Sequence, residues 1–171
     1  DAIQAALTQR FGEEKWVLSF TYGNVYLDEV AAAKRKVSIE EIERVANQAL
    51  KAVPGIAEAF THTQLSAGRL PANAITKSVA NGFFSSRNGN LIVIPQPFYL
   101  LGTPDAASHG TPYEYDTHVP VLFYGAGVAA GSFASVSSPA DIAPTLATLL
   151  KLETPSNSVG HVLMEAIKSS R

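Results

Sequence analysis

Short apolar segments alternate with helical segments along this 171-residue chain, and this alternation restricts its fold more than any other feature. Apolar and β-branched residues predict strands over residues 16–22, 25–28, 56–60, 91–94 and 119–124. Helical spacing predicts helices over about residues 1–11, 39–52, 72–83 and 160–168. Continuous apolar strands are typical of sheets that helices cover. The pattern therefore predicts an α/β layer structure.

Two helix starts carry clear capping signals. Ser38 precedes Glu41 by three residues, which is a capping box, and Pro54-Gly55 ends the helix that follows. Residues 24–60 are therefore predicted to form a strand–helix–strand unit. The acidic residues at the start of this helix are interpreted as a solvated first turn that complements the helix dipole: Glu40, Glu41 and Glu43.

The second helix start is Ser138, which is suited to the N-cap position, with Pro139 at the first helical position. Asp141 in the first turn is interpreted as part of the cap, with a functional role as the alternative. Four apolar residues of this helix are expected to face inward: Ile142, Leu146, Leu149 and Leu150.

Composition excludes several classes of function. With 13 basic and 15 acidic residues, the formal charge is −2, and no basic cluster suggests a nucleic-acid partner. The chain has no cysteine, which excludes disulfides and thiolate metal sites, and no apolar run approaches the ~20 residues of a membrane span. It starts at Asp1 without a signal-peptide profile, so we expect either a processed chain or a piece of a longer one.

Residues 95–117 are predicted to be a long irregular segment, which in a compact domain is typical of a functional loop. His109 lies in it beside Gly110, and imidazole is the commonest protein metal ligand. Asp116 and His118 could join His109 in a three-ligand zinc site with an open fourth position. The alternative is that Asp116 caps a turn, His118 bonds at a strand edge and His109 is structural or exposed.

Other catalytic patterns are absent from the sequence. It contains no Gly-x-Ser-x-Gly nucleophile elbow, no Walker motif and no dinucleotide-binding glycine pattern. Gly125-Ala126-Gly127 follows a predicted strand but lacks the third glycine, so it is interpreted as a turn.

Several runs together resemble a known family. They are His109–Pro120, Phe123–Gly125 and Ser138–Leu146, supported upstream by Gln64–Gly68 and Asn88–Asn90. These runs are similar to the C-terminal segment of the alkaline phosphatase superfamily, most of all to bacterial alkaline phosphatases of the type I phosphodiesterase/nucleotide pyrophosphatase branch. The resemblance implies the C-terminal part of an α/β/α sandwich, with residues 24–60 as a small subdomain.

The resemblance also implies a chemistry. In this family, Asp and His side chains hold two zinc ions, and a Thr or Ser attacks phosphorus. The resemblance maps His109 onto the last zinc ligand of the family. His118 and Asp141 match family positions that are interpreted as structural. This chain has no Asp-His-Gly motif, no Asp-x-x-x-His pair and no nucleophile segment. No catalytic residue is therefore assigned here.

We thus expect residues 1–171 to form one C-terminal region of a longer, periplasmic or secreted metallohydrolase that acts on a phosphate ester. The partner is the missing N-terminal part of the same polypeptide, with no nucleic acid and no membrane involved. By itself the chain is expected to be inactive and not to retain zinc, because one imidazole makes a weak site.

Two other interpretations remain open. A sulfatase or phosphonate hydrolase would share the architecture. A self-contained binding module would instead be a compact monomer or dimer without a large exposed apolar face. A fragment should have apolar strands that lack sheet neighbours and a tendency to self-associate through exposed edges. The residues expected to show this are Val93, Ile94, Val121, Leu122 and Phe123.

Overall fold

The computed structural model describes residues 2–101 and 109–168. Residues 102–108 of the predicted loop, Ser108 included, and the chain ends at 1 and 169–171 lie outside the described residues. The chain divides into two compact units, Asp1–Thr117 (unit 1) and His118–Arg171 (unit 2).

Unit 1 contains a four-stranded sheet with the strand order β1-β2-β4-β3. The strands are β1 (Val17–Thr21), β2 (Asn24–Leu27), β3 (Ile56–Thr61) and β4 (Leu91–Pro95). Each neighbouring pair is antiparallel. Since β2 and β3 are both antiparallel to β4, they run parallel to each other with β4 between them. The mixed α/β class is therefore confirmed.

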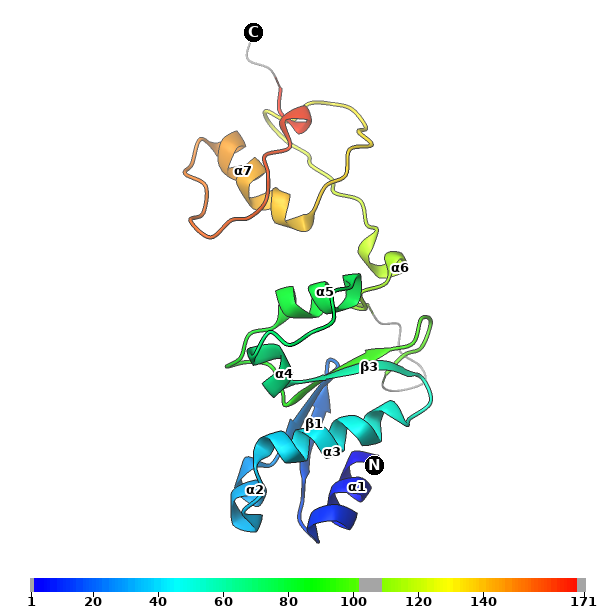
Figure 1. Cartoon of the computed structure of the whole chain (residues 1–171). Helices are drawn as coiled ribbons and strands as arrows, with labels where there is room; N and C mark the ends of the chain where they lie inside the picture. The colour runs from blue at the N-terminus through cyan, green and yellow to red at the C-terminus, as the bar shows by residue number, and fades with distance from the viewer. Residues whose placement is uncertain (1, 102–108, 169–171) are drawn as a thin grey trace. The chain divides into compact units, whose positions relative to one another are not determined.

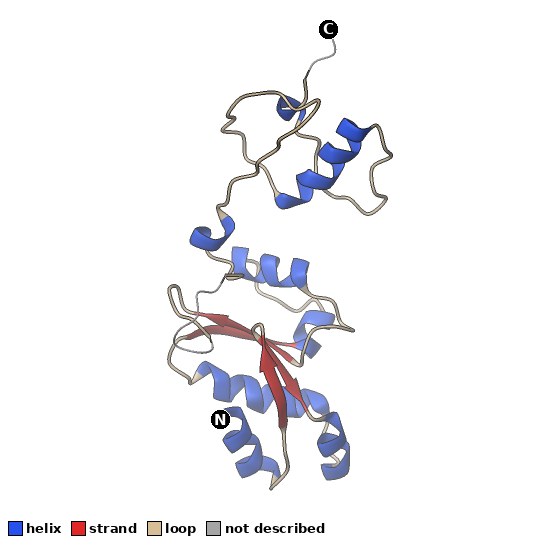
Figure 2. Cartoon of the chain, turned by 180° about the vertical axis from the view of Figure 1, so that it is seen from behind, coloured by secondary structure: helices blue, strands red, loops and turns tan. Residues whose placement is uncertain are grey.

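Helices cover both faces of this sheet (Figures 1 and 2). Leu91 and Val93 of β4 belong to one apolar core, whereas Ile92 and Ile94 belong to the other. This alternation follows from the strand geometry, which points successive side chains to opposite faces. One core packs against α1 (Ala2–Phe11), α2 (Glu29–Arg35) and α3 (Ile39–Lys51), and the other against α4 (His62–Ser66) and α5 (Ala74–Gly82).

The segment between β2 and β3 contains two helices where the sequence predicts one. The Ser38 side chain accepts a hydrogen bond from the Glu41 backbone N–H, so the predicted start of α3 is confirmed. The additional helix, α2, begins at the N-cap Asp28, whose carboxylate accepts bonds from Val30 N and Ala31 N. Its seven residues are too few to give a clear periodic signal.

One acidic residue of α3 differs from its expectation. Glu43 is only 1% exposed, and its Oε2 accepts a hydrogen bond from Thr63 N at 3.1 Å. The prediction of a solvated Glu43 is therefore wrong. A backbone N–H supplied by α4 holds this carboxylate inside the fold, which the spacing along α3 does not reveal.

Unit 2 is built around one helix. The 3-10 turn η1 (Pro139–Asp141) leads into α7 (Ile142–Leu150), and a second turn, η2 (Met164–Ala166), lies near the end of the chain. The Ser138 side chain accepts a bond from Ala140 N and Asp141 completes the capping box, so this predicted helix start is confirmed. An isolated antiparallel bridge joins Val128 to Ile167.

Several predictions for unit 2 are wrong. Residues 119–124 form no strand, and residues 160–168 contain only the short turn η2. Three of the four α7 residues expected to face inward are exposed: Ile142, Leu146 and Leu150. Their apolar patterns are those of packed elements, but the described part of unit 2 leaves these three helix side chains exposed.

The strands were expected to lack sheet neighbours, and the outcome differs between the two units. Val93 and Ile94 are 3% and 7% exposed in a strand paired on both sides, so that expectation is wrong for them. Leu122, by contrast, is 87% exposed and lies outside any strand. Among the described residues, no helix is both long and apolar enough to cross a membrane.

Candidate functional site

The candidate site is the loop that carries His109 and runs into α6 (Glu114–Thr117). His109 is exposed, and Gly110 after it has a φ of 98°, a conformation that glycine adopts at little cost. Asp116 Oδ2 accepts hydrogen bonds from Thr111 N at 2.8 Å and from Thr111 Oγ1 at 2.6 Å. These bonds close the turn next to His109, so Asp116 acts as the turn cap.

The same bonds control the charge of this carboxyl. Hydrogen bonds from the Thr111 hydroxyl and then the Thr111 backbone N–H lower the pKa of Asp116 below its usual 3.8, with a smaller contribution from the charge of His109. Asp116 is therefore ionised at neutral pH and lies within electrostatic range of the His109 ring.

Aromatic side chains attach the loop to the sheet of unit 1. The Tyr113 hydroxyl donates a hydrogen bond to the Pro95 carbonyl, at the end of β4, over 2.7 Å. The Tyr115 ring stacks on Tyr113 and Phe98, with centroid distances of 5.7 and 4.8 Å. Burial raises the pKa of Tyr113, which keeps its hydroxyl protonated as a donor. The loop is thus held at the end of β4, one of the two inner strands of the sheet.

The Asp116 cap makes a pH-dependent prediction. Folding lowers the pKa of Asp116, so the ionised carboxylate stabilises the folded turn. This stabilisation is complete above pH ~4 and is lost as the pH falls through the folded-state pKa. The Thr111 amide resonance should therefore keep its hydrogen-bonded chemical shift at pH 7 and lose it in acid. In Asp116→Asn the shift should already be altered at pH 7, whereas the neighbouring Glu114→Gln should leave it unchanged. An unaltered Thr111 resonance in Asp116→Asn would contradict the cap.

The remaining candidates lie in unit 2. His118 is its first residue and is exposed. Asp141 is 5% exposed and accepts bonds from His161 N and Ser138 N, each at 2.7 Å. These two backbone hydrogen bonds, with that of His161 the larger, lower the pKa of Asp141. Its carboxylate is engaged as a helix cap, which agrees with a structural role.

The described residues do not assemble a complete metal centre. Within residues 2–101 and 109–168, no group of three or more His, Cys, Asp or Glu side chains could hold a metal ion. The hypothetical three-ligand site of His109, Asp116 and His118 is therefore not formed there. This donor set does not fit the three or four ligands that zinc requires.

Comparison with known proteins identifies relatives over nearly the whole chain. It is 28% identical to alkaline phosphatase PafA of Elizabethkingia meningoseptica and 30% identical to alkaline phosphatase PhoV of Synechococcus elongatus, over 96% and 92% of this chain. A calcium-transporting ATPase of Myroides odoratus is 30% identical over 95%. The crystal structure of PafA superposes with a TM-score of 0.86 over 97% of this chain.

The resemblance to the alkaline phosphatase superfamily is confirmed. The mixed α/β fold matches PafA as a C-terminal part of that alkaline phosphatase. The chain spans 30%, 30% and 29% of the lengths of the Myroides protein, PafA and PhoV, and 32% of the PafA crystal chain. No family model matches the chain.

Proposed function

We propose that this chain is the C-terminal portion of a zinc-dependent phosphoric ester hydrolase, to which it supplies His109 as one metal ligand. The observation that carries the proposal is the match to PafA, which covers 97% of this chain at a TM-score of 0.86 but only 32% of the PafA chain. The nucleophile and the other ligands would then belong to the part of the protein that this chain does not contain.

The loop geometry supports this role for His109. The ring is exposed, so a metal ion can reach it, and the Asp116–Thr111 bonds fix the turn that follows. Tyr113 holds the same loop at the end of β4. A metal-binding side chain that is positioned in advance loses little conformational freedom when the metal binds. In this proposal, the chain contributes the position of one donor and leaves the chemistry to the complete enzyme.

The same proposal covers the reaction and the location of the whole protein. The whole protein would hydrolyse a phosphate ester as an alkaline phosphatase or phosphodiesterase of the type I phosphodiesterase/nucleotide pyrophosphatase branch, in the periplasm or outside the cell. A self-contained binding module fits less well, because unit 2 exposes large apolar side chains such as Leu122 at 87% and Tyr124 at 105%. Such a module should have covered them.

The proposal predicts that the isolated chain does not turn over substrate. The purified 171-residue chain should release no product from a chromogenic phosphate ester above the buffer rate, with or without added zinc, because one imidazole cannot form the site. A chimera in which this chain replaces the segment of PafA that it matches should be active. If the isolated chain shows zinc-dependent turnover, and His109→Ala abolishes that turnover, the proposed division of the site is contradicted.

A further inference from the structure

One face of α3 and the junction of β3 with α4 line a cavity of about 290 Å³, which we name the α3–α4 cavity. Helices α3 and α4 lie next to each other in unit 1 (Figures 1 and 2). The α3 side of the cavity includes Arg44, Asn47, Gln48 and Lys51, which recur three or four positions apart and therefore share one helix face. The opposite face of α3 packs into an apolar core. The junction contributes polar side chains as well, among them Gln64.

Asn47 is a buried polar residue of this lining that lacks a partner. The residue is 8% exposed, and its Oδ1 is buried without a hydrogen bond from any described residue. Glu43, one turn earlier, bonds instead to Thr63 N. The Asn47 Nδ2 also donates to no described residue, but it is not closed off as Oδ1 is, so a molecule in the cavity can reach it. Folded proteins pair nearly all buried polar groups, so this amide indicates a partner from outside the described residues.

Two glutamines of the lining also leave their amide nitrogens available. Gln64 Oε1 accepts a hydrogen bond from Thr61 N at 3.1 Å, within the capping box of α4. Gln48 Oε1 accepts one from Arg44 Nη1 at 3.5 Å. Among the described residues, neither Nε2 group donates a hydrogen bond. With Asn47, the cavity therefore has three amides whose oxygens are engaged or buried and whose N–H groups are free to donate.

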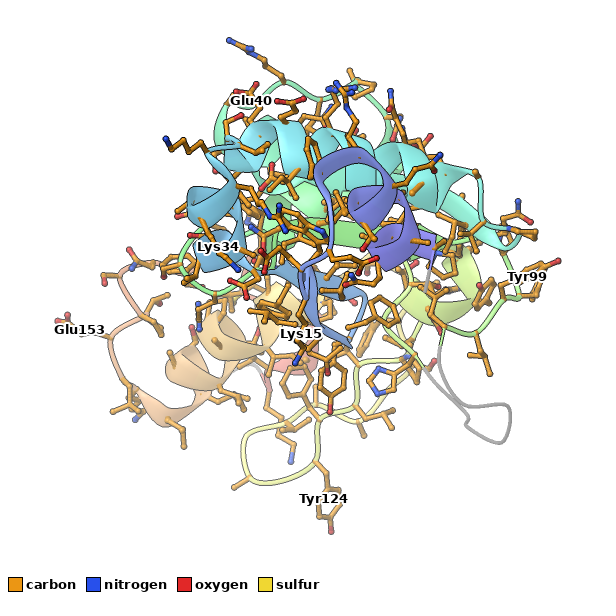
Figure 3. All side chains as sticks on the ribbon, turned by 90° about the horizontal axis from the view of Figure 1, so that it is seen from below. Lys15, Lys34, Glu40, Tyr99, Tyr124 and Glu153 are labelled. Atoms are coloured by element: carbon orange, nitrogen blue, oxygen red, sulfur yellow. The ribbon has the colours of Figure 1, made fainter. Side chains whose placement is uncertain are left out.

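The charges of the lining favour an anion. Arg44 and Lys51 are cationic, and Glu40 is the acidic member of the lining. Glu40 points outward from the first turn of α3 (Figure 3). Arg44 lies 4.0 Å from Glu41, and Lys51 lies 3.5 Å from Glu58, in pairs whose side chains are at least 41% exposed. Such exposed pairs are weak, so both cations can turn toward a ligand.

We propose that the α3–α4 cavity binds a small oxyanion, a phosphate or a carboxylate, through the Asn47 amide and the Arg44 guanidinium. An oxyanion supplies only acceptor atoms, which match the free N–H donors and the two cations. A sugar or an amine would need acceptors, and the amide oxygens of this lining are already engaged or buried. One water molecule takes about 30 Å³, so the cavity has room for phosphate or a small dicarboxylate. The site does not involve His109, so it does not depend on the proposed hydrolase function.

Titration of the 171-residue chain tests the site directly. Inorganic phosphate and succinate are added separately at pH 7, and the side-chain amide resonances are followed by NMR. At least one anion should shift the Asn47 and Gln64 side-chain amides with saturation, and sodium chloride at the same ionic strength should not. Asn73 is the control resonance, because its Oδ1 already accepts a bond from Thr76 N and it lies outside the lining. It should not move.

The two anions distinguish the sources of the oxyanion. Saturation by phosphate alone identifies a phosphate site, saturation by succinate alone identifies a carboxylate site, and saturation by both identifies a general oxyanion site. Each of these results supports the proposal. Unsaturated shifts with both anions, or an equal shift of Asn73, would overturn it, because the anions would then act on the whole surface.

Matched variants assign the binding to the named side chains. Arg44→Gln should raise the dissociation constant of the bound anion at least tenfold, because it removes a cation from the lining. Lys15→Gln is the control, since Lys15 is exposed and outside the lining, and it should change this constant by less than twofold. Equal weakening in the two variants would overturn the proposal.

Asn47→Leu separates binding from stability. Leucine has a similar size and removes an amide that has no partner in the described protein, so the variant should unfold at the same temperature as the parent chain or above it. It should nevertheless bind the anion at least tenfold more weakly. A folded Asn47→Leu chain that binds the anion as tightly as the parent chain would overturn the role of this amide. Arg44→Gln tests the same site on an exposed side chain, where the fold is not at risk.

Discussion

Replacing His109 by alanine in the PafA chimera should lower kcat/KM for a phosphate monoester by roughly a hundredfold to ten-thousandfold. A metal ion is worth several kcal/mol of transition-state stabilisation, and each 1.36 kcal/mol corresponds to about a factor of ten in rate. If His109 is a ligand, its loss removes much of that contribution. The measurement is steady-state kinetics at saturating zinc, with circular dichroism to show that the variant is folded.

The matched control for this prediction is His118→Ala. His118 is also exposed and follows in the same stretch of sequence, but it is interpreted as structural. Its substitution should change kcat/KM by less than about tenfold, the lower end of what supporting residues around a metal site contribute. Equal losses in the two variants would contradict a role that His109 has and His118 lacks, and no loss in His109→Ala would remove His109 from the site.

Replacing Trp16 by alanine should lower the free energy of unfolding of unit 1 by about 3–5 kcal/mol. Its side chain is fully buried in the core that α1, α2 and α3 share with the sheet. Its ring meets Phe11 edge-on at 5.8 Å, and its Nε1 donates a hydrogen bond to the Gly12 carbonyl at 3.0 Å. The substitution therefore removes packing, an aromatic pair and the donor that satisfies the Gly12 carbonyl.

Urea denaturation followed by circular dichroism measures this loss, since Trp16 is the single tryptophan and the variant has lost that fluorescence signal. Val30→Ala is the control in the same unit, because Val30 is 78% exposed, and it should change the free energy of unfolding by about 0.5 kcal/mol or less. A loss below ~1 kcal/mol in Trp16→Ala would show that this core does not stabilise unit 1 as its burial indicates.

The sequence predicts unit 1 far better than unit 2, and the reason is physical. β4 and residues 119–124 carry the same apolar signal, yet only β4 finds strands on both sides within this chain. An apolar pattern indicates that a segment will be buried, but it does not indicate by which part of a protein. Within residues 2–101 and 109–168, the segment 119–124 pairs with no strand.

The site shows a similar division between local and distant information. The Ser38 and Ser138 caps are local, and both are found as predicted. The role of Asp116 could not be decided from its spacing to His118, because the deciding partner is Thr111, five residues earlier. The assignment of His109 as a metal ligand came from the family resemblance. A single histidine in a loop carries little information about whether it binds a metal.

The zinc content of the purified PafA chimera tests the central claim most directly. Elemental analysis after dialysis should find two zinc ions per chimera, as expected for a two-metal hydrolase, and fewer than two in the His109→Ala variant. The isolated chain should retain none. Two zinc ions retained by a folded His109→Ala chimera would contradict the claim that this loop supplies a metal ligand.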